Sequence, residues 1–419
     1  MFKLKFKLLA LIAFLFGASL ALAQDSGALI EALLRKGILT DQEAEDLRAD
    51  LANDATAKLA STSLTPNLSK MTISGRFQAQ FVSFDTDIKD TLADPAYVNH
   101  AFLRRIYIGF KPVFSNGWSA YLNYDFAGST FDAAYIEKIF SPAMTVHAGF
   151  KKAPIGYEEY FISSGALKSI ERSALTRFFV EGNNGRRLGA GSYRQGVWVL
   201  GKDPSGFSWE FAVTNPEREE SSAGTAGTGS AANNVFAYWA NLNYQKPFAE
   251  TQGLFKLGTT YGYLPDQGGK KLGDGKDLAV WSIYADLRYR NFSILGEYMG
   301  SDNEQGVSAT QDSNSAGYYL QGSYRYDAYE PVVRYTFVDS DGRGIQTSDG
   351  LRSTPSGGTM NELTEWFFGV NWYIIGNEAK HEVKLQAGYL FGESRDSILG
   401  VTGPKANTHG FRSQLQVNF

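Results

Sequence analysis

The chain ends on FRSQLQVNF (residues 411–419), in which apolar and polar side chains alternate up to a terminal aromatic residue. Phe411, Leu415 and Phe419 fall on one face of this stretch, and Arg412 falls on the other. A period of two residues is that of a β-strand with one apolar and one polar face. Because any half-buried strand alternates in this way, the rest of the chain decides what kind of sheet the last strand belongs to.

The same alternation continues through most of the chain from Met71 onward. Sixteen segments show it, and the connections between them are alternately short and long, except that 127–130 is short where a long one is expected. Transmembrane β-barrels have this pattern, with tight turns at one end and extended loops at the other. The predicted strands are 71–84, 99–111, 117–126, 131–140, 143–152, 186–201, 207–215, 234–247, 254–264, 277–289, 291–300, 315–327, 329–339, 360–375, 380–393 and 408–419.

The chain end and the composition both favour an outer-membrane barrel. A last strand that finishes on Phe is similar to the last strand of Gram-negative outer-membrane barrels. Aromatic residues make up 14% of the chain, and cysteine is absent, so no disulfide contributes to the fold. We predict an all-β fold, a 16-stranded antiparallel transmembrane β-barrel over 71–419 with a short N-terminal helical periplasmic extension. The alternative, a soluble periplasmic β-sandwich or β-helix, predicts no aromatic girdle and no alternation of loop length.

Three parts are expected before the barrel. Residues 1–23 combine a basic start, an apolar run and an A-x-A site, which indicates a signal peptide. Residues 24–60 contain two stretches of helical spacing, the second with a capping box at Thr40. They predict a periplasmic helical hairpin or coiled coil, or else a loosely ordered extension. Residues 61–70 are a predicted linker, and no later apolar run is long enough for a transmembrane helix.

Alternation also assigns the two faces of the predicted wall. Trp118 and Leu122 are expected to face lipid, and Asn123 and Asp125 to face the interior. Sixteen strands enclose enough space for a water-filled channel, whereas the interior of eight strands is filled by side chains. The polar inward positions therefore predict a channel.

The longest connection, 153–185, differs from the other predicted loops because it is apolar. It contains Tyr157, Phe161 and Phe178, whose exposure to water would be unfavourable. We expect this loop to fold into the barrel and to constrict it, with a short helix over 164–178. Long ordered loops of this kind often carry function.

The sequence around this loop resembles a known family. GFKKAP (149–154), SSGAL (163–167) and IERS (170–173) are similar to the phosphate-selective porin O and P family, in which a strand ending in G-x-[FY]-K-x-P runs into an S-S-x-x-L-x-x-[IFL]-E-R loop. RRIYIG (104–109) and RRLG (186–189) are similar to strands of that family on either side of the loop. The resemblance implies a sixteen-stranded trimeric porin with its third external loop folded inward.

Charge near the loop favours anions. Residues 151–187 carry seven Lys and Arg against four Glu, a net charge of +3 in a chain whose net charge is −4. Cations at a narrow, partly desolvated site attract anions, and Arg can bind phosphate oxygens in a bidentate way. The structural alternative is that these cations pair with lumen acids, for example Arg172 with Glu171, and only hold the wall and the loop. The candidate residues of the pore constriction and anion path are Lys151, Lys152, Lys168, Arg172, Arg177, Arg186, Arg187 and Arg105.

We predict a passive outer-membrane porin for small hydrophilic solutes, anion-preferring, with phosphate as one candidate, and without catalysis, cofactor or metal. The four histidines show no metal-ligand spacing, and the negative net charge gives no nucleic-acid footprint. Expected partners are outer-membrane lipid and lipopolysaccharide, two further copies in a homotrimer, and the cell wall through 24–60. The first alternative is a structural or adhesive barrel tethered by its N-terminal helices. The second is a lipid-acting enzyme, for which no Ser/His/acid or metal set can be assembled.

Overall fold

The computed structural model describes residues 67–91, 94–182, 184, 186–216, 235–248, 250, 252–265, 276–308, 310–378, 381–397 and 405–419. The predicted signal peptide (1–23), the helical extension (24–60) and most of the predicted linker (61–70) lie outside these residues. Within the described ranges, no helix has both the length and the apolar character needed to cross a bilayer.

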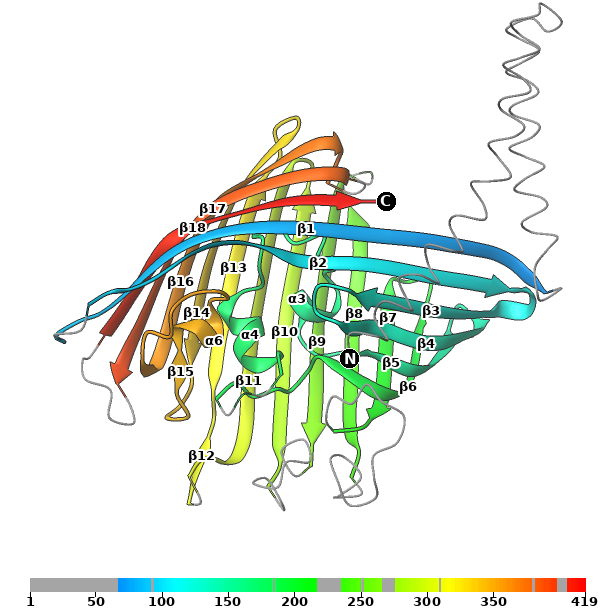
Figure 1. Cartoon of the computed structure of the whole chain (residues 1–419). Coiled ribbons are helices and arrows are strands. Elements are labelled where there is room, and N and C mark those ends of the chain that lie inside the picture. The colour runs from blue at the N-terminus through cyan, green and yellow to red at the C-terminus, as the bar shows by residue number, and fades with distance from the viewer. Residues whose placement is uncertain are drawn as a thin grey trace, which may run out of the picture. The chain divides into compact units, whose positions relative to one another are not determined.

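Sixteen long antiparallel strands form the wall of a closed barrel (Figure 1). Each pairs with the next long strand along the chain, and the last pairs with the first, which closes the sheet. The predicted fold class is confirmed for this part of the chain. The long strands are β1 (Leu68–Ile88), β2 (Ala96–Phe114), β3 (Trp118–Asp125), β4 (Thr130–Ser141), β5 (Met144–Lys152), β6 (Tyr193–Lys202), β7 (Phe207–Thr214), β8 (Ala237–Phe248), β9 (Gly253–Leu264), β10 (Leu278–Tyr289), β11 (Phe292–Ser308), β13 (Ala316–Tyr324), β14 (Tyr329–Asp339), β16 (Thr359–Gly376), β17 (His381–Ser397) and β18 (Lys405–Asn418).

Short elements occupy the connections between these strands. They are the strands β12 (Gln311–Ser313) and β15 (Ile345–Gln346), the 3-10 turn η1 (Ser115–Gly117), and the helices α3 (Tyr157–Tyr160), α4 (Ala174–Phe179) and α6 (Thr347–Gly350). Helices α3 and α4 both belong to the long connection between β5 and β6.

The C-terminal strand closes the barrel against β1. The backbone N–H of Gly75 donates to the carbonyl of Phe419 at 2.8 Å, and the N–H of Phe419 donates back at 3.1 Å. A Cβ atom added at Gly75 would lie 2.0 Å from the Phe419 ring, so the aromatic end of the chain requires glycine on the neighbouring strand. The terminal alternation therefore ends in a specific contact at the barrel seam.

The two faces of the wall follow the predicted alternation. Trp118 and Leu122 are 48% and 41% exposed on the outer face, whereas Asn123 and Asp125 are buried. Outward apolar residues and inward polar residues are the arrangement that a lipid-embedded wall around a polar interior requires.

The start of β6 differs from the prediction of a strand over 186–201. The strand begins at Tyr193, and the preceding residues extend the long connection. The N–H groups of Leu188 and Ala190 donate to the carbonyls of Phe178 and Phe179 at 2.9 Å each. These residues therefore complete the hydrogen bonds at the end of α4 instead of joining the sheet.

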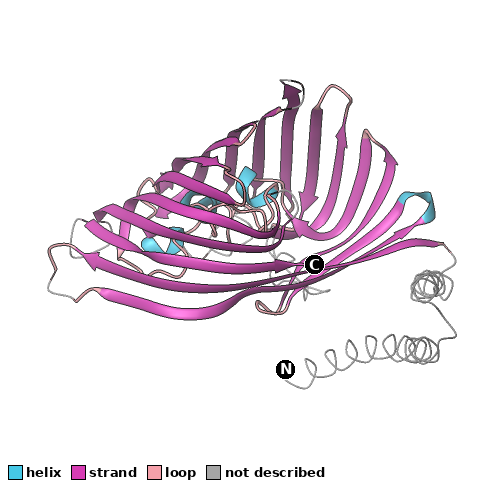
Figure 2. Ribbon diagram, turned by 90° about the horizontal axis from the view of Figure 1, so that it is seen from above, coloured by secondary structure: helices cyan, strands magenta, loops and turns pink. Residues whose placement is uncertain are grey.

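The predicted helix over 164–178 is wrong in extent. Only α4, six residues long, is helical there, and Ile170 has a positive φ of 66°. Several carbonyl groups between 164 and 168 accept hydrogen bonds from side chains of the barrel wall, so they are not available for helical bonds. Figure 2 shows helical and loop segments within the ring of strands.

Candidate functional site

The connection between β5 and β6 is bound along one edge to the inner face of the barrel wall. Lys384 Nζ donates to the carbonyls of Gly165 at 2.9 Å and Leu167 at 3.1 Å. Gln386 Nε2 also donates to the Leu167 carbonyl at 3.0 Å, and Gln416 Nε2 donates to that of Gly165 at 3.2 Å. Buried donors on β17 and β18 thus satisfy a stretch of irregular backbone that would otherwise lack partners.

Glu171 fixes the next part of the loop. Arg104 binds its carboxylate through both Nε at 2.6 Å and Nη2 at 3.2 Å, and Arg352 approaches it at 3.2 Å. Gln80 Nε2 donates to the same carboxylate at 2.9 Å. Burial opposes charge on Glu171, but the neighbouring Arg104 and Arg352 outweigh it and hold its pKa well below the usual range. The carboxylate is therefore a charged anchor between the loop and the wall.

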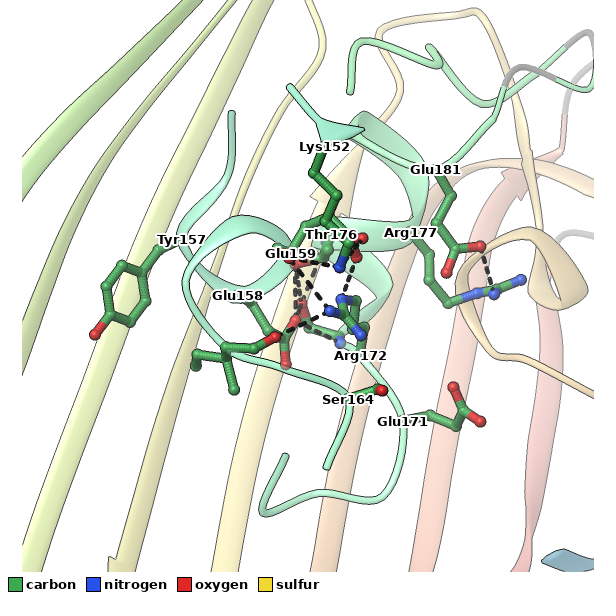
Figure 3. Close-up of polar contacts among 12 residues, drawn as sticks. Lys152, Tyr157, Glu158, Glu159, Ser164, Glu171, Arg172, Thr176, Arg177 and Glu181 are labelled. Carbon is green, nitrogen blue, oxygen red and sulfur yellow. Dashed lines mark hydrogen bonds and ion pairs between the residues drawn. The ribbon is translucent and has the colours of Figure 1, made fainter. Parts of the chain in front are cut away.

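Glu158 joins the two helices of the loop (Figure 3). Its Oε2 accepts hydrogen bonds from Ser173 N at 2.8 Å, Ser173 Oγ at 2.7 Å and Thr176 Oγ1 at 2.7 Å. Ser173 is the N-cap of α4 and accepts from Thr176 N at 3.2 Å. Arg334 on β14 donates to Glu158 Oε1 at 3.1 Å, which ties this joint to the wall.

The apolar side chains of the loop belong to a buried cluster that takes side chains from most of the barrel wall, from β1 to β17. Phe178 and Phe179 of α4 are fully buried in a cluster with Trp198, Trp239 and Met299. These wall residues lie on β6, β8 and β11. The aromatic content that singled out the loop in the sequence is thus explained by packing inside the barrel.

A cavity of about 830 Å³ remains beside the packed loop. Its lining includes Glu181 and Arg352, from long connections that fold inward to the wall, and Glu378 and Phe419 at the end with short turns. The cavity therefore runs along the channel interior from these inward-folded connections to the end with short turns. Its charged lining residues are Arg76, Arg104, Arg105, Lys152, Arg172, Arg352, Asp125, Asp132, Glu159, Glu181 and Glu378.

Three of the eight predicted cations, Arg105, Lys152 and Arg172, line this cavity. The other five lie outside its lining and are paired with carboxylates. These pairs are Lys151 with Glu210 at 3.1 Å, Lys168 with Glu330 at 2.6 Å, Arg177 with Glu181 at 2.7 Å, Arg186 with Asp349 at 2.6 Å, and Arg187 with Glu181 at 3.2 Å.

Three cavity cations, Arg76, Arg104 and Arg352, are absent from the predicted set. Arg76 falls on the inward alternation of β1 and was available from the pattern. Strict alternation admits only one of Arg104 and Arg105, yet both bond to interior groups, Arg104 to Glu171 and Arg105 to Gln78. Arg352 lies in a connection without strand periodicity, so the alternation of residues could not predict that it faces the interior.

Most cavity cations are compensated by acids. Arg104 and Arg352 bind Glu171, and both Lys152 and Arg172 bind Glu159. Burial opposes the charge on Arg172, but Glu159 and Glu158 outweigh it and raise the pKa of the guanidinium above its ordinary value.

Arg76 and Arg105 differ from the other cavity cations. Arg76 donates to Asn418 Oδ1 at 3.0 Å and to Ser164 Oγ at 2.8 Å, and Arg105 donates to Gln78 Oε1 at 2.9 Å. In the part of the chain that the structure describes, neither has a carboxylate within 4.0 Å. Asp132 lines the same cavity, but its carboxylate already accepts hydrogen bonds from Tyr107, Asn123 and Tyr193.

Among the described residues, no three His, Cys, Asp or Glu side chains are grouped closely enough to hold a metal ion.

A closed antiparallel barrel with a polar passage defines the class of outer-membrane porins. The sequence matches the model of the family Phosphate-selective porin O and P over residues 71–419, and the chain belongs to that family. The protein is thus an outer-membrane channel for small solutes of a Gram-negative bacterium, and the family favours a channel over an enzyme.

Solved structures share the fold at low sequence identity. OmpT, an outer membrane protein of Vibrio cholerae, is 9% identical with a TM-score of 0.50, and the match covers 83% of this chain and 99% of that chain. The outer membrane channel DcaP of Acinetobacter baumannii is 12% identical with a TM-score of 0.50, over 84% of this chain and 97% of that chain. Among curated proteins, none matches the sequence.

Proposed function

We propose that this porin prefers anions, that the 153–185 loop narrows its passage, and that small hydrophilic anions such as phosphate diffuse through it. The observation that carries the proposal is the pair of cavity-lining arginines, Arg76 and Arg105, without a carboxylate partner in the described part of the chain. Uncompensated cations in a partly buried passage lower the energy of an anion and raise that of a cation.

The loop supports the narrowing role through its attachments. Glu171 joins it to β2 and to the 340–358 connection, while Lys384 and Gln416 hold its backbone against β17 and β18. A loop held at several points keeps a passage of constant width, which a freely moving loop would not do.

Further parts of the proposal concern export and assembly. We include a cleaved signal peptide over 1–23, a homotrimer, contact with lipopolysaccharide at the long connections, and a cell-wall contact through 24–60. They are supported by the sequence pattern of the N-terminus and by what the family resemblance implies.

The test is the reversal potential of the purified full-length protein in a planar bilayer under a KCl gradient, repeated with added phosphate. Chloride preference and a reduced chloride current in phosphate are expected. Potassium preference would reject the anion proposal and retain the channel. Folded protein without conductance would favour the alternative of a structural barrel.

A further inference from the structure

The channel interior contains a second cavity beside the 830 Å³ cavity described above. Its volume is about 310 Å³, and side chains of β5 to β8, such as Thr145, Ser208 and Asn243, contribute to its lining. It also touches Pro142 and Lys202, so it lies toward the end with short turns. Within the described part of the chain, Phe161 alone belongs to the linings of both cavities.

The second cavity is polar enough to be part of the aqueous interior. Asn241 lines it and is only 2% exposed, and its Oδ1 has no hydrogen-bond partner among the described residues. Ser208 Oγ donates to Asn243 Oδ1 at 2.8 Å in the same lining. Buried amide oxygens without a protein partner are normally satisfied by water. We therefore treat this space as a hydrated side chamber.

The Phe161 ring is held in position at the boundary. Lys256 Nζ lies 3.9 Å from the ring centroid, within the range of a cation–π interaction. The rings of Tyr160 and Tyr157 lie at centroid distances of 5.1 and 5.3 Å from it, the first edge-on. The ring is thus supported from β9 and from α3, and its orientation is restricted.

We propose that Phe161 is the size-determining residue of the channel, because its ring separates the charged cavity from the hydrated side chamber. Removing the ring joins the two spaces into one wider passage, and a larger ring narrows the charged one. The inference rests on the proposed function insofar as the passage must conduct. It concerns the width of the passage, which is independent of its charge preference.

The experiment measures single-channel conductance and solute size for Phe161→Ala, Phe161→Leu and Phe161→Trp in the full-length protein. Conductance is expected to rise in Phe161→Ala, because the cavities of 310 and 830 Å³ are no longer separated by the ring, and to fall in Phe161→Trp. Swelling of liposomes should show faster entry of a neutral trisaccharide through Phe161→Ala, with Phe161→Leu intermediate.

The matched control is Phe236→Ala. Phe236 is 53% exposed before β8 and borders neither cavity, so conductance and size limit should not change. Heat-modifiable mobility on gels establishes that each barrel is folded, and Phe161→Leu keeps most of the packing if the alanine variant fails to fold. Wild-type conductance and sugar entry in folded Phe161→Ala or Phe161→Leu would overturn the inference. If the wild type were potassium-selective but the Phe161 variants showed the expected order of conductance and trisaccharide entry, only the anion preference would be rejected.

Discussion

The two sides of the channel interior share one wall pattern but carry opposite chemistry. Inward positions on β2 and β4 present Arg105 and Asp132 to the large cavity. Inward positions on β13 and β14 present Tyr319 and Val338, which belong to the same buried cluster as Phe178, and both strands contact α4 of the loop. The comparison indicates that the loop is attached to the wall in two ways, by packing at α4 and by charged hydrogen bonds at Glu171. Helix α4 buries Phe178 and Phe179 on the packed side, whereas Tyr160 and Phe161 of the same loop line the large cavity on the charged side.

The largest expected effect comes from breaking the charge cluster that fastens the loop to the packed side. Arg334 lies between Glu158 at 3.1 Å and Glu365 at 2.6 Å, and all three are almost fully buried. Arg334→Met would leave two buried carboxylates without their cation. We expect the free energy of unfolding to fall by about 3–5 kcal/mol, measured by denaturant titration of the folded barrel.

Arg395→Met is the matched control for this prediction. The Arg395 side chain is 58% exposed and pairs with Glu393, so its loss should change the free energy of unfolding by less than about 0.5 kcal/mol. Equal effects of the two substitutions would show that the buried cluster does not hold the packed side.

The second largest effect is expected on ion selectivity, from the arginines that line the large cavity. In Arg76→Gln/Arg105→Gln, the two cavity cations without a carboxylate partner in the described chain become neutral. The chloride-to-potassium permeability ratio should then fall by about fivefold to tenfold, because the acids of the lining are no longer outweighed. Reversal potentials under a KCl gradient measure the change.

Arg290→Gln removes one positive charge, against two in the double variant, from a turn between β10 and β11. Arg290 lies outside the cavity lining and donates to Gln252 at 3.0 Å. Its permeability ratio should equal that of the wild type. A shift in log permeability ratio at least half as large as that of the double variant would mean that overall charge, rather than the cavity pair, sets selectivity.

The sequence predicted the wall better than the loop, for a physical reason. Strand alternation is a local property, so the number of strands and the faces of Trp118 and Asn123 follow from the pattern alone. The path of the loop depends on contacts with distant strands, such as the bond of Lys384 to the Gly165 carbonyl, and local spacing cannot encode these. The predicted helix over 164–178 was wrong for this reason.

The predicted cations show the same division. Arg105 lines the cavity from an inward position of β2, whereas Lys152, which also lines it, lies next to the inward-facing Lys151 on β5, so alternation does not account for both lysines. Lys168 and Arg186 were selected by charge alone, and the structure pairs them with Glu330 and Asp349. Positive charge in a sequence does not reveal whether an acid from another strand will compensate it.

The smallest expected effect concerns the pH dependence of folding stability that arises from Glu181, where the loop is attached to the 340–358 connection. Glu181 accepts charged hydrogen bonds from Arg177 at 2.7 Å and Arg352 at 2.7 Å. Burial opposes its charge, but Arg177, Arg352 and Arg187 outweigh burial and lower its pKa to about 2. A carboxyl group whose pKa is lower in the folded state stabilises the fold above its unfolded pKa, which is about 4.3, and this contribution is lost as the pH falls through about 2.

Glu181→Gln should therefore lower the free energy of unfolding by about 1 kcal/mol at pH 7, and the difference from the wild type should shrink between pH 4 and pH 2. Thermal unfolding across this pH range measures it. Glu362→Gln is the control, since Glu362 makes no ion pair among the described residues and its difference should stay small throughout. If the Glu181→Gln difference persisted unchanged to pH 2, the arginines would not be what stabilises the ionised carboxylate. The long connections would then be attached to the loop by packing, as on the apolar side.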